Sequence, residues 1–341
     1  MRATRHSLSR IGCATIVWLY VLALVSWLAL RPGSGDSLWW LAIFNIFAPF
    51  LFAPLVPAAL GVWLTGSRLS RIGWLLAFAI LVVWLGPTFL PKLAPVSGNA
   101  RPQIRVMTLN AYVDSLIAEP LLTSIRFESP DVVVLQELNE LNATSLAELK
   151  TSFPYHSLMP LQGEEGGLGV LSKFPFQDHS WLTLANQLTD AQWVTLDVAG
   201  RSIDLLNVHL VSNRLSVFND ESRARFDAAN RTREQQAREI GALVREHPNC
   251  IVAGDLNTTD TTMPHEILQS ELKDSYREMG SGPGATFSSE WFWYGPIPVP
   301  PRLLRLDYIL HTRSMVTLEA HVGARDSQSD HLPVIATLFI K

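Results

Sequence analysis

The chain has 341 residues, 48% of them hydrophobic, and a formal net charge of −4 at pH 7. Residues 1–100 hold seven basic side chains and one acid, so they carry about +6 and the remainder about −10. The acidic remainder lacks the general basic surface that sequence-independent nucleic-acid binding requires, which leaves only a local groove for such a ligand. The two cysteines, Cys13 and Cys250, lie in apolar runs, and we expect no disulfide.

Three apolar segments occupy the first 91 residues. Residues 11–30 are uncharged and follow three arginines, and twenty such residues in a helix cross a hydrocarbon core of about 30 Å. We interpret them as a membrane span rather than a cleaved signal peptide, because further apolar segments follow. Residues 38–64 contain Pro49, Pro54 and Pro57 and predict one kinked helix, with a re-entrant segment as the alternative. Residues 72–90 predict a third span.

The basic residues indicate an orientation for this predicted anchor, residues 1–91. Arginines flank the N-terminus and the connection that holds Arg68 and Arg71, so the positive-inside rule places both in the cytoplasm. Three crossings then direct the rest of the chain outward. A re-entrant second segment would reverse that assignment.

Residues 92–102 form a short linker rich in Pro and Gly, and residues 103–341 form the predicted soluble domain. Short β-branched runs alternate there with stretches of helical apolar spacing, which predicts an α/β domain of two or four layers. The predicted strands are residues 104–109, 132–135, 169–171, 193–198, 203–208, 251–253, 306–310 and 334–339, and the predicted helices are residues 116–128, 141–150 and 231–246.

Polar residues follow or close several of these strands. In the segment NCIVAGDLNT, Asp255 and Asn257 stand two residues apart after a buried run, so in extended chain both side chains face one target. Strand ends in a sandwich meet at one rim, which predicts a shared site there. The polar strand-end residues are Asn110, Gln136, Glu137, Asn207, His209, Asp255, Asn257, Asp307, Ser329, Asp330 and His331.

Most of these residues also have a purely structural explanation when considered singly. Asn110 resembles a turn residue, Asp255 a helix cap, and His209 a partly buried histidine with a satisfied ring. Asp307 is different, because a buried carboxylate inside an apolar strand needs a partner. His331 is the natural partner, and the carboxylate would fix its tautomer and raise its pKa.

Taken together and in this order, the strand-end residues resemble those of the endonuclease/exonuclease/phosphatase superfamily, the deoxyribonuclease I-like proteins. The resemblance runs from about residue 103 to residue 341. It implies a four-layer α/β sandwich and a hydrolase acting on phosphoester bonds. The apolar N-terminus lies outside the resemblance and is similar to that of membrane-anchored bacterial members, which implies the bacterial inner membrane. With the orientation expected from the basic residues, the domain would face the periplasm.

The resemblance also implies a metal site. Glu137 would be the principal ligand of a divalent cation, with Asn110 close by and Asp330 contributing to the site or to its surroundings. Oxygen ligands suit Mg²⁺, with Mn²⁺ as the alternative.

Five further residues receive catalytic roles from the resemblance. Asp255 would orient or deprotonate the attacking water, and Asn257 would hold that water or a phosphate oxygen. His331, oriented by Asp307, and His209 would donate to phosphate oxygens. Abasic-site endonucleases usually have a tyrosine where this chain has His209, which argues against that branch.

Three loops near these residues have competing interpretations. The glycine-rich residues 163–173 lack the ending of a phosphate-binding loop and precede a strand, so we interpret them as a plain loop. Residues 213–239 balance six arginines against five acids, which favours a solvated loop and helix, with Arg214 kept as a possible substrate contact. Trp291 opens an aromatic cluster for which a lipid-facing role is slightly favoured over core packing or base stacking.

The sequence therefore predicts a membrane-anchored, metal-dependent phosphoesterase acting on a lipid or another membrane-proximal phosphodiester or phosphomonoester. A membrane-tethered nuclease is the alternative. A catalytically silent binding protein of the same fold is less compatible, because its polar strand-end residues would have been free to disappear. No protein partner is predicted.

Overall fold

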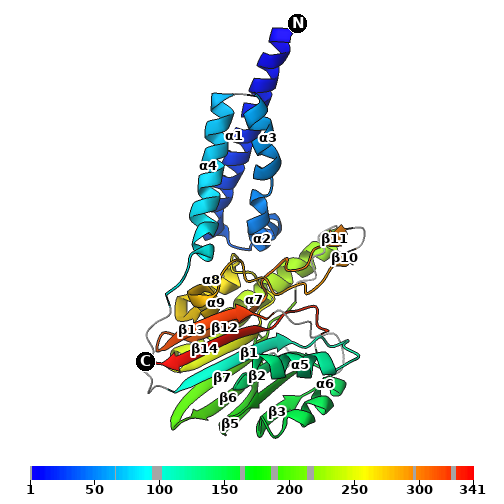
Figure 1. Cartoon of the computed structure of the whole chain (residues 1–341), viewed down its shortest axis with the longest axis vertical. Helices are drawn as coiled ribbons and strands as arrows, with labels where there is room; N and C mark the ends of the chain where they lie inside the picture. The colour runs from blue at the N-terminus through cyan, green and yellow to red at the C-terminus, as the bar shows by residue number, and fades with distance from the viewer. Residues whose placement is uncertain are drawn as a thin grey trace. The chain divides into compact units, whose positions relative to one another are not determined.

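The computed structural model describes residues 2–65, 67–93, 102–161, 166–185, 191–212, 219–294, 297–323 and 328–341. The chain divides into two compact units, an N-terminal unit, Met1–Leu90, and a C-terminal unit, Pro91–Lys341 (Figure 1).

Two long helices, α1 (Arg2–Ser34) and α4 (Arg68–Leu85), pack together in the N-terminal unit. Each belongs to a segment long and apolar enough to cross a membrane. Between them lie α2 (Trp39–Ile46), the 3₁₀ helix η1 (Ala48–Phe52) and α3 (Leu55–Thr65), and a second 3₁₀ helix, η2 (Gly86–Phe89), follows α4. The segment from α2 to α3 passes the same test but is bent by 82°. The described residues therefore contain two helices long and apolar enough to span a membrane, or three such segments if this bent pair is one span.

The bend in the middle segment is stabilised from the two long helices. Its prolines remove backbone donors, and a buried carbonyl without a partner is costly. Tyr20 Oη donates to the Leu51 carbonyl at 2.7 Å, and Trp74 Nε1 donates to the Leu55 carbonyl at 2.9 Å. Side chains from α1 and α4 therefore hold the part of the middle segment that follows its bend.

The C-terminal unit contains two six-stranded sheets. Sheet A has the order β13-β14-β1-β2-β4-β3, and sheet B has the order β5-β6-β7-β8-β12-β9. A two-stranded ladder, β10 (Phe292–Tyr294) with β11 (Ile297–Val299), lies outside both. The strands of the two sheets are β1 (Gln103–Asn110), β2 (Val132–Leu138), β3 (Tyr155–Met159), β4 (Gly167–Ser172), β5 (Phe176–Leu182), β6 (Ala191–Val198), β7 (Arg201–His209), β8 (Cys250–Asp255), β9 (Leu272–Asp274), β12 (Asp307–Thr312), β13 (Met315–Val322) and β14 (Val334–Ile340).

Helices cover the outer faces of the sheets, so the unit has four layers. One apolar cluster lies between the sheets, a second joins sheet A to α5 and the segment after it, and a third joins sheet B to α7 and α8. The predicted four-layer α/β sandwich is confirmed. The helices are α5 (Glu119–Glu128), α6 (Glu140–Ser145), the 3₁₀ helix η3 (Leu146–Leu149), α7 (Asp220–Arg245), α8 (Met263–Glu271) and α9 (Ser275–Met279).

The inner faces of the sheets change from apolar to polar along the strands. Side chains two residues apart share a face, and on β1 the inward side chains run from Ile104 and Val106 to Asn110. On β7 they run from Ile203 and Leu205 to His209. Both strands thus end in a polar side chain at the same end of the sandwich.

The predicted central strands are present, whereas several peripheral elements were not predicted. Strands β3 and β5 lie at sheet edges and are half-exposed and polar, so they lack an apolar run. The helix predicted at residues 231–246 begins earlier, at Asp220, after an Asn219 cap that a Ser222 hydroxyl completes. The first turns of that helix are rich in charged residues, so they show no apolar periodicity that would predict a helix.

A buried ion pair fixes the start of β12. Both terminal nitrogens of Arg305 donate to the Asp274 carboxylate, at 2.6 and 2.8 Å, and the guanidinium stacks on Tyr308 at 4.4 Å. Burial alone would raise the pKa of Asp274, but Arg305 and a hydrogen bond from His265 hold it below its usual range. Because Arg305 lies two residues before Asp307, this pair constrains the backbone that carries Asp307.

We expect Asp274→Ala to lower the free energy of unfolding by about 3–5 kcal/mol, because it leaves the Arg305 guanidinium buried without its carboxylate. Urea unfolding of the full chain in detergent measures the loss. Glu148→Ala is the control, since it removes an exposed ion pair with Arg126 and should cost at most about 1 kcal/mol. Equal losses in the two variants would contradict a buried-pair role.

Candidate active site

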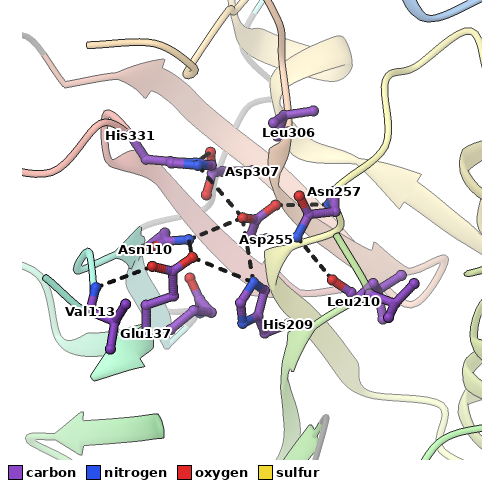
Figure 2. Close-up of polar contacts among 12 residues, drawn as sticks. Asn110, Val113, Glu137, His209, Leu210, Asp255, Asn257, Leu306, Asp307 and His331 are labelled. Atoms are coloured by element: carbon purple, nitrogen blue, oxygen red, sulfur yellow. Dashed lines mark hydrogen bonds and ion pairs between the residues drawn. The ribbon is translucent and has the colours of Figure 1, made fainter. Parts of the chain in front are cut away.

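The strand-end residues converge at the rim of the sandwich from both sheets. Sheet pairing places Asn110 beside Gln136, and it places Asp255 between His209 and Asp307. Figure 2 shows the labelled rim side chains pointing toward one another, and hydrogen bonds and close ion pairs join Asn110, Glu137, His209, Asp255 and His331. The structure therefore brings together the following predicted residues: Asn110, Glu137, His209, Asp255, Asn257, Asp307 and His331.

A bulge in β2 turns Glu137 toward this rim. Regular pairing of β2 with β4 stops at Leu135 opposite Gly169 and resumes at Leu138 opposite Gly167, so β2 has one extra residue between the two pairs. Glu137 has a φ of 50°, a left-handed conformation that is uncommon outside glycine. Gly166 packs under it, where an added Cβ would lie 2.4 Å from the Glu137 Cα.

Asn110 links the two sheets through a fixed amide orientation. Its Oδ1 accepts a hydrogen bond from the Tyr112 N–H at 3.0 Å, so its Nδ2 faces the carboxylates. Nδ2 donates to Glu137 Oε1 at 2.8 Å and to Asp255 Oδ2 at 3.1 Å. The other oxygen of Glu137 accepts from the Val113 N–H at 3.1 Å. One amide therefore orients two carboxylates from opposite sheets.

Both imidazoles face Asp255. His331 Nε2 lies 3.7 Å from Asp255 Oδ2, and His209 Nε2 lies 3.9 Å from the same oxygen and 3.8 Å from Glu137 Oε1. The other ring nitrogen of His331 pairs with Asp307 Oδ2 at 2.7 Å, as the sequence predicts. Asp307 is fully buried, so this bond fixes the orientation of the ring.

Charge and burial shift the pKa values of Asp255 and His331. Burial raises the pKa of Asp255, and the neighbouring His331 offsets part of that rise. Burial would lower the pKa of His331, but Asp307 and then Asp255 outweigh it and raise that pKa well above the usual range. The arrangement thus favours a cationic His331 at neutral pH.

Hydrogen bonds fix Asp255 and Asn257 at the end of β8. The Asn257 N–H donates to Asp255 Oδ1 at 2.8 Å, which leaves Oδ2 facing the imidazoles. Asn257 Nδ2 donates to the Leu210 carbonyl at 2.9 Å, and its own carbonyl accepts from Arg233 Nη1 at 2.7 Å. Gly254 allows the backbone of β8 to approach Val208 of β7, because a Cβ at position 254 would lie 1.9 Å from the Val208 carbonyl oxygen.

The remaining predicted residues are Asp330, Trp291 and Arg214. Asp330 is partly exposed, and burial, with the charges of Glu137 and Asp255, raises its pKa. Trp291 is 66% exposed on a segment that begins at Ser289, whose N–H donates to the Asp330 carbonyl at 2.8 Å. Arg214 lies outside the described residues.

The oxygen-rich part of the rim fits a divalent cation. Ligand atoms of Asp255, Asp307 and His331 lie within 4.8 Å of one another, but His331 Nδ1 and Asp307 Oδ2 are already engaged in their 2.7 Å hydrogen bond. The carboxylate of Glu137, neighboured by Asn110 and Asp330, keeps free lone pairs and offers the hard oxygen ligands that Mg²⁺ prefers. We therefore assign the fit to the Glu137 side of the rim.

Two hydroxyl groups also organise the rim: that of Ser329, one of the predicted strand-end residues, and that of Thr286, which the sequence does not predict. Thr286 Oγ1 accepts from the N–H groups of Leu306 at 3.1 Å and Asp307 at 3.3 Å. Ser329 Oγ donates to the Asn110 carbonyl at 2.6 Å and accepts from the His331 N–H at 2.9 Å. Small polar residues in loops are common, so the sequence carries no signal for Thr286.

Two facing sheets with carboxylates and imidazoles at one rim define a class of α/β sandwich hydrolases that cleave phosphoester bonds. The chain belongs to the endonuclease/exonuclease/phosphatase family, whose model matches residues 107–331. No curated protein matches the chain.

Similar solved structures share the fold at low identity. An endonuclease/exonuclease/phosphatase from Beutenbergia cavernae DSM 12333 is 23% identical, with a TM-score of 0.53 over 70% of this chain and 72% of that one. D. rerio TDP2, complexed with single strand DNA product, is 17% identical, with a TM-score of 0.54 over 69% and 98%. The human Nocturnin catalytic domain, with bound sulfate anion, is 19% identical, with a TM-score of 0.52 over 72% and 97%.

We expect Gly166→Ala to weaken Mn²⁺ binding by at least about tenfold, because the new Cβ displaces the backbone of Glu137. Isothermal titration calorimetry of the full chain in detergent measures the Kd. Gly200→Ala is the matched control, since Gly200 also has a positive φ, of 81°, but has open space around its Cβ position. An unchanged Kd in Gly166→Ala would show that this packing does not position Glu137.

Proposed function

We propose that the chain is a membrane-anchored, divalent-metal-dependent phosphoesterase that hydrolyses a phosphodiester or phosphomonoester of a lipid or another membrane-proximal substrate. The observation that carries this proposal is the rim itself. Asp255 Oδ2 lies 3.1 Å from Asn110 and within 4 Å of two imidazoles, in a family that hydrolyses phosphoesters.

In this proposal Glu137 is the principal cation ligand, with Asn110 beside it and Asp330 in the site or its surroundings. The bound cation, Mg²⁺ or alternatively Mn²⁺, supplies Lewis-acid stabilisation of charge on the phosphate oxygens. The Asn110 amide and the Val113 N–H orient the Glu137 carboxylate for this task.

Asp255 accepts a proton from the attacking water through Oδ2, since Oδ1 is held by the Asn257 N–H. Burial raises its pKa, which suits a general base. Asn257 contributes to holding the water or a phosphate oxygen, as the sequence predicts.

His331 and His209 donate to phosphate oxygens that gain negative charge during in-line displacement. Asp307 keeps His331 Nδ1 occupied, so Nε2 is the atom directed to the substrate. Donors placed where charge develops act without reorganisation, and each commonly contributes about 10²–10³ in rate.

Three features support a lipid or membrane-proximal substrate. The N-terminal unit has two helices apolar enough to span a membrane. The loop that supplies the Val113 N–H continues to Leu116, which is 86% exposed, and Ile117, which is 52% exposed. Trp291 is also exposed on a segment bonded to Asp330, and we retain Trp291 and Arg214 as substrate contacts. A membrane-tethered nuclease is the second candidate, favoured by the DNA-bound structure of TDP2.

A screen of the full chain in detergent with Mg²⁺ or Mn²⁺ tests this function. We expect turnover of sphingomyelin or phosphoinositide vesicles to exceed turnover of plasmid and single-stranded DNA. Asp255→Asn should reduce the vesicle turnover by at least about 10²-fold while leaving the free energy of unfolding unchanged. Ser281→Ala, outside the rim, is the control. Preference for DNA would favour the nuclease, and full turnover by Asp255→Asn would refute the site.

The raised pKa of His331 predicts a pH dependence. A pKa above the unfolded value stabilises the protein below that value, and this stabilisation is lost as pH rises through the folded pKa. Activity that needs protonated His331 is also lost as the pH rises through this pKa. We expect Asp307→Asn to move the alkaline limb of kcat down by about 1–3 pH units.

A pH–rate profile of each variant checks this shift. Asp204→Asn is the matched control. Asp204 likewise pairs with a histidine, His247, at 2.8 Å, but this pair lies away from the rim. An alkaline limb that does not move in Asp307→Asn would mean that His331 does not titrate in the observed range.

We also propose that the protein is integral to the bacterial inner membrane, with the C-terminal unit facing the periplasm. Alkaline phosphatase fused after Lys341 should then be active, and the same reporter fused after Thr65 should be inactive, because three crossings place that connection in the cytoplasm. The reverse pattern at Lys341 would mean that the segment from α2 to α3 is re-entrant.

A further inference from the structure

A layer of buried polar side chains lies between the two sheets, one step below the rim. Gln136, Asn207, Gln192 and Thr108 are all fully buried. Thr108 and Asn207 stand two residues before Asn110 and His209, so they share the same inward faces. Amides at such positions are costly unless they are hydrogen-bonded, and this layer is joined by hydrogen bonds from Thr108 through Gln136 to Asn207.

Asn207 makes the contacts that cross from sheet B to sheet A. Its Oδ1 accepts from Gln136 Nε2 at 2.8 Å. Its Nδ2 donates to two backbone carbonyls of sheet A, those of Leu135 at 3.0 Å and Gly169 at 3.2 Å, and lies 3.3 Å from Gln192 Oε1. A side chain of one sheet is thus bonded to the main chain of the other.

These two carbonyls belong to the residues at which the bulge begins. Leu135 and Gly169 are the last regular pair of β2 and β4 before the extra residue, and Glu137 follows with its left-handed backbone. Backbone groups at an interrupted ladder need other partners. The preceding inward-facing side chain of β7, that of Leu205, is aliphatic and has no hydrogen-bond donor for these carbonyls.

We infer that Asn207 is a positioning residue for Glu137: its carboxamide holds the bulge that aims this carboxylate at the rim. The inference rests on the proposed function, in which Glu137 is the principal ligand of a divalent cation. Among the described hydrogen bonds, Asn207 makes none to the rim side chains, so it acts through the backbone of β2.

A purely structural role for the layer makes a different prediction. In that case any disruption of the layer would lower stability and leave cation binding unchanged in the folded protein. Thr108 separates the two explanations, because it bonds to Gln136 in the same layer but makes no bond to Leu135 or Gly169 among the described contacts.

The test measures the Kd for Mn²⁺ by isothermal titration calorimetry on the full chain in detergent. Asn207→Leu keeps the volume and removes the donor, and Asn207→Ser, which leaves room for water, serves if the first variant does not fold. Thr108→Val is the matched control for loss of a buried hydrogen bond, and the thermal midpoint of each variant reports stability.

We expect both Asn207 variants to raise the Kd for Mn²⁺ by about 10- to 100-fold, the range for residues that orient a metal ligand, and Thr108→Val to leave it within about twofold. Equal Kd values in Asn207 and Thr108 variants, or a wild-type chain that binds no divalent cation, would overturn the inference. Failure of the proposed function looks different: the wild-type chain binds Mn²⁺ but cleaves no phosphoester, and the comparison of Kd values still decides the role of Asn207.

Discussion

The candidate active site depends on one constraint, the register between two sheets that face each other across an apolar core. Asn110 comes from sheet A and Asp255 from sheet B, and a hydrogen bond of 3.1 Å joins them. Face-to-face sheets stand about 10 Å apart, and side chains from both inner faces fill that gap. A shift of either sheet by a fraction of a residue would break contacts of this length. The core below the rim is therefore part of the machinery of the site.

Backbone geometry at the rim shows how this register is converted into side-chain direction. Tyr112, Glu137 and Asn257 are non-glycine residues with φ values of 61°, 50° and 48°. Tyr112 orients the Asn110 amide through its N–H, and Asn257 does the same for Asp255. Such conformations persist only where surrounding contacts fix them. Their concentration here indicates that the fold tolerates local strain to aim its polar groups.

Much of this organisation was predictable from the sequence, because it depends on local patterns. The central strands β1, β2, β7 and β8 are β-branched runs that end in polar residues, and both features are visible without a structure. The pairing of Asp307 with His331 followed from the cost of burying a carboxylate, and the two atoms lie 2.7 Å apart.

The rest depends on contacts between residues distant in the chain. Asn207 and Leu135 are 72 residues apart, and nothing near Asn207 in the sequence signals the bond between them. The bulge at Glu137 is likewise invisible locally, since Gly166 packs under it from a different loop. Edge strands such as β5 carry polar, half-exposed side chains that resemble loop sequence. Local patterns thus reveal which residues reach the rim but not how their backbones are turned.

The excess of carboxylates over imidazoles at the rim has a kinetic consequence. Four carboxylates, those of Glu137, Asp255, Asp307 and Asp330, lie around two imidazoles, so the protein alone presents net negative charge to an anionic substrate. Like charges in a partly desolvated cleft repel strongly. In the function proposed above, a phosphoester therefore gains attraction to this rim only after a dication is in place. The order of addition in that proposal follows from the charge of the site, and cation concentration would then govern substrate capture as well as turnover.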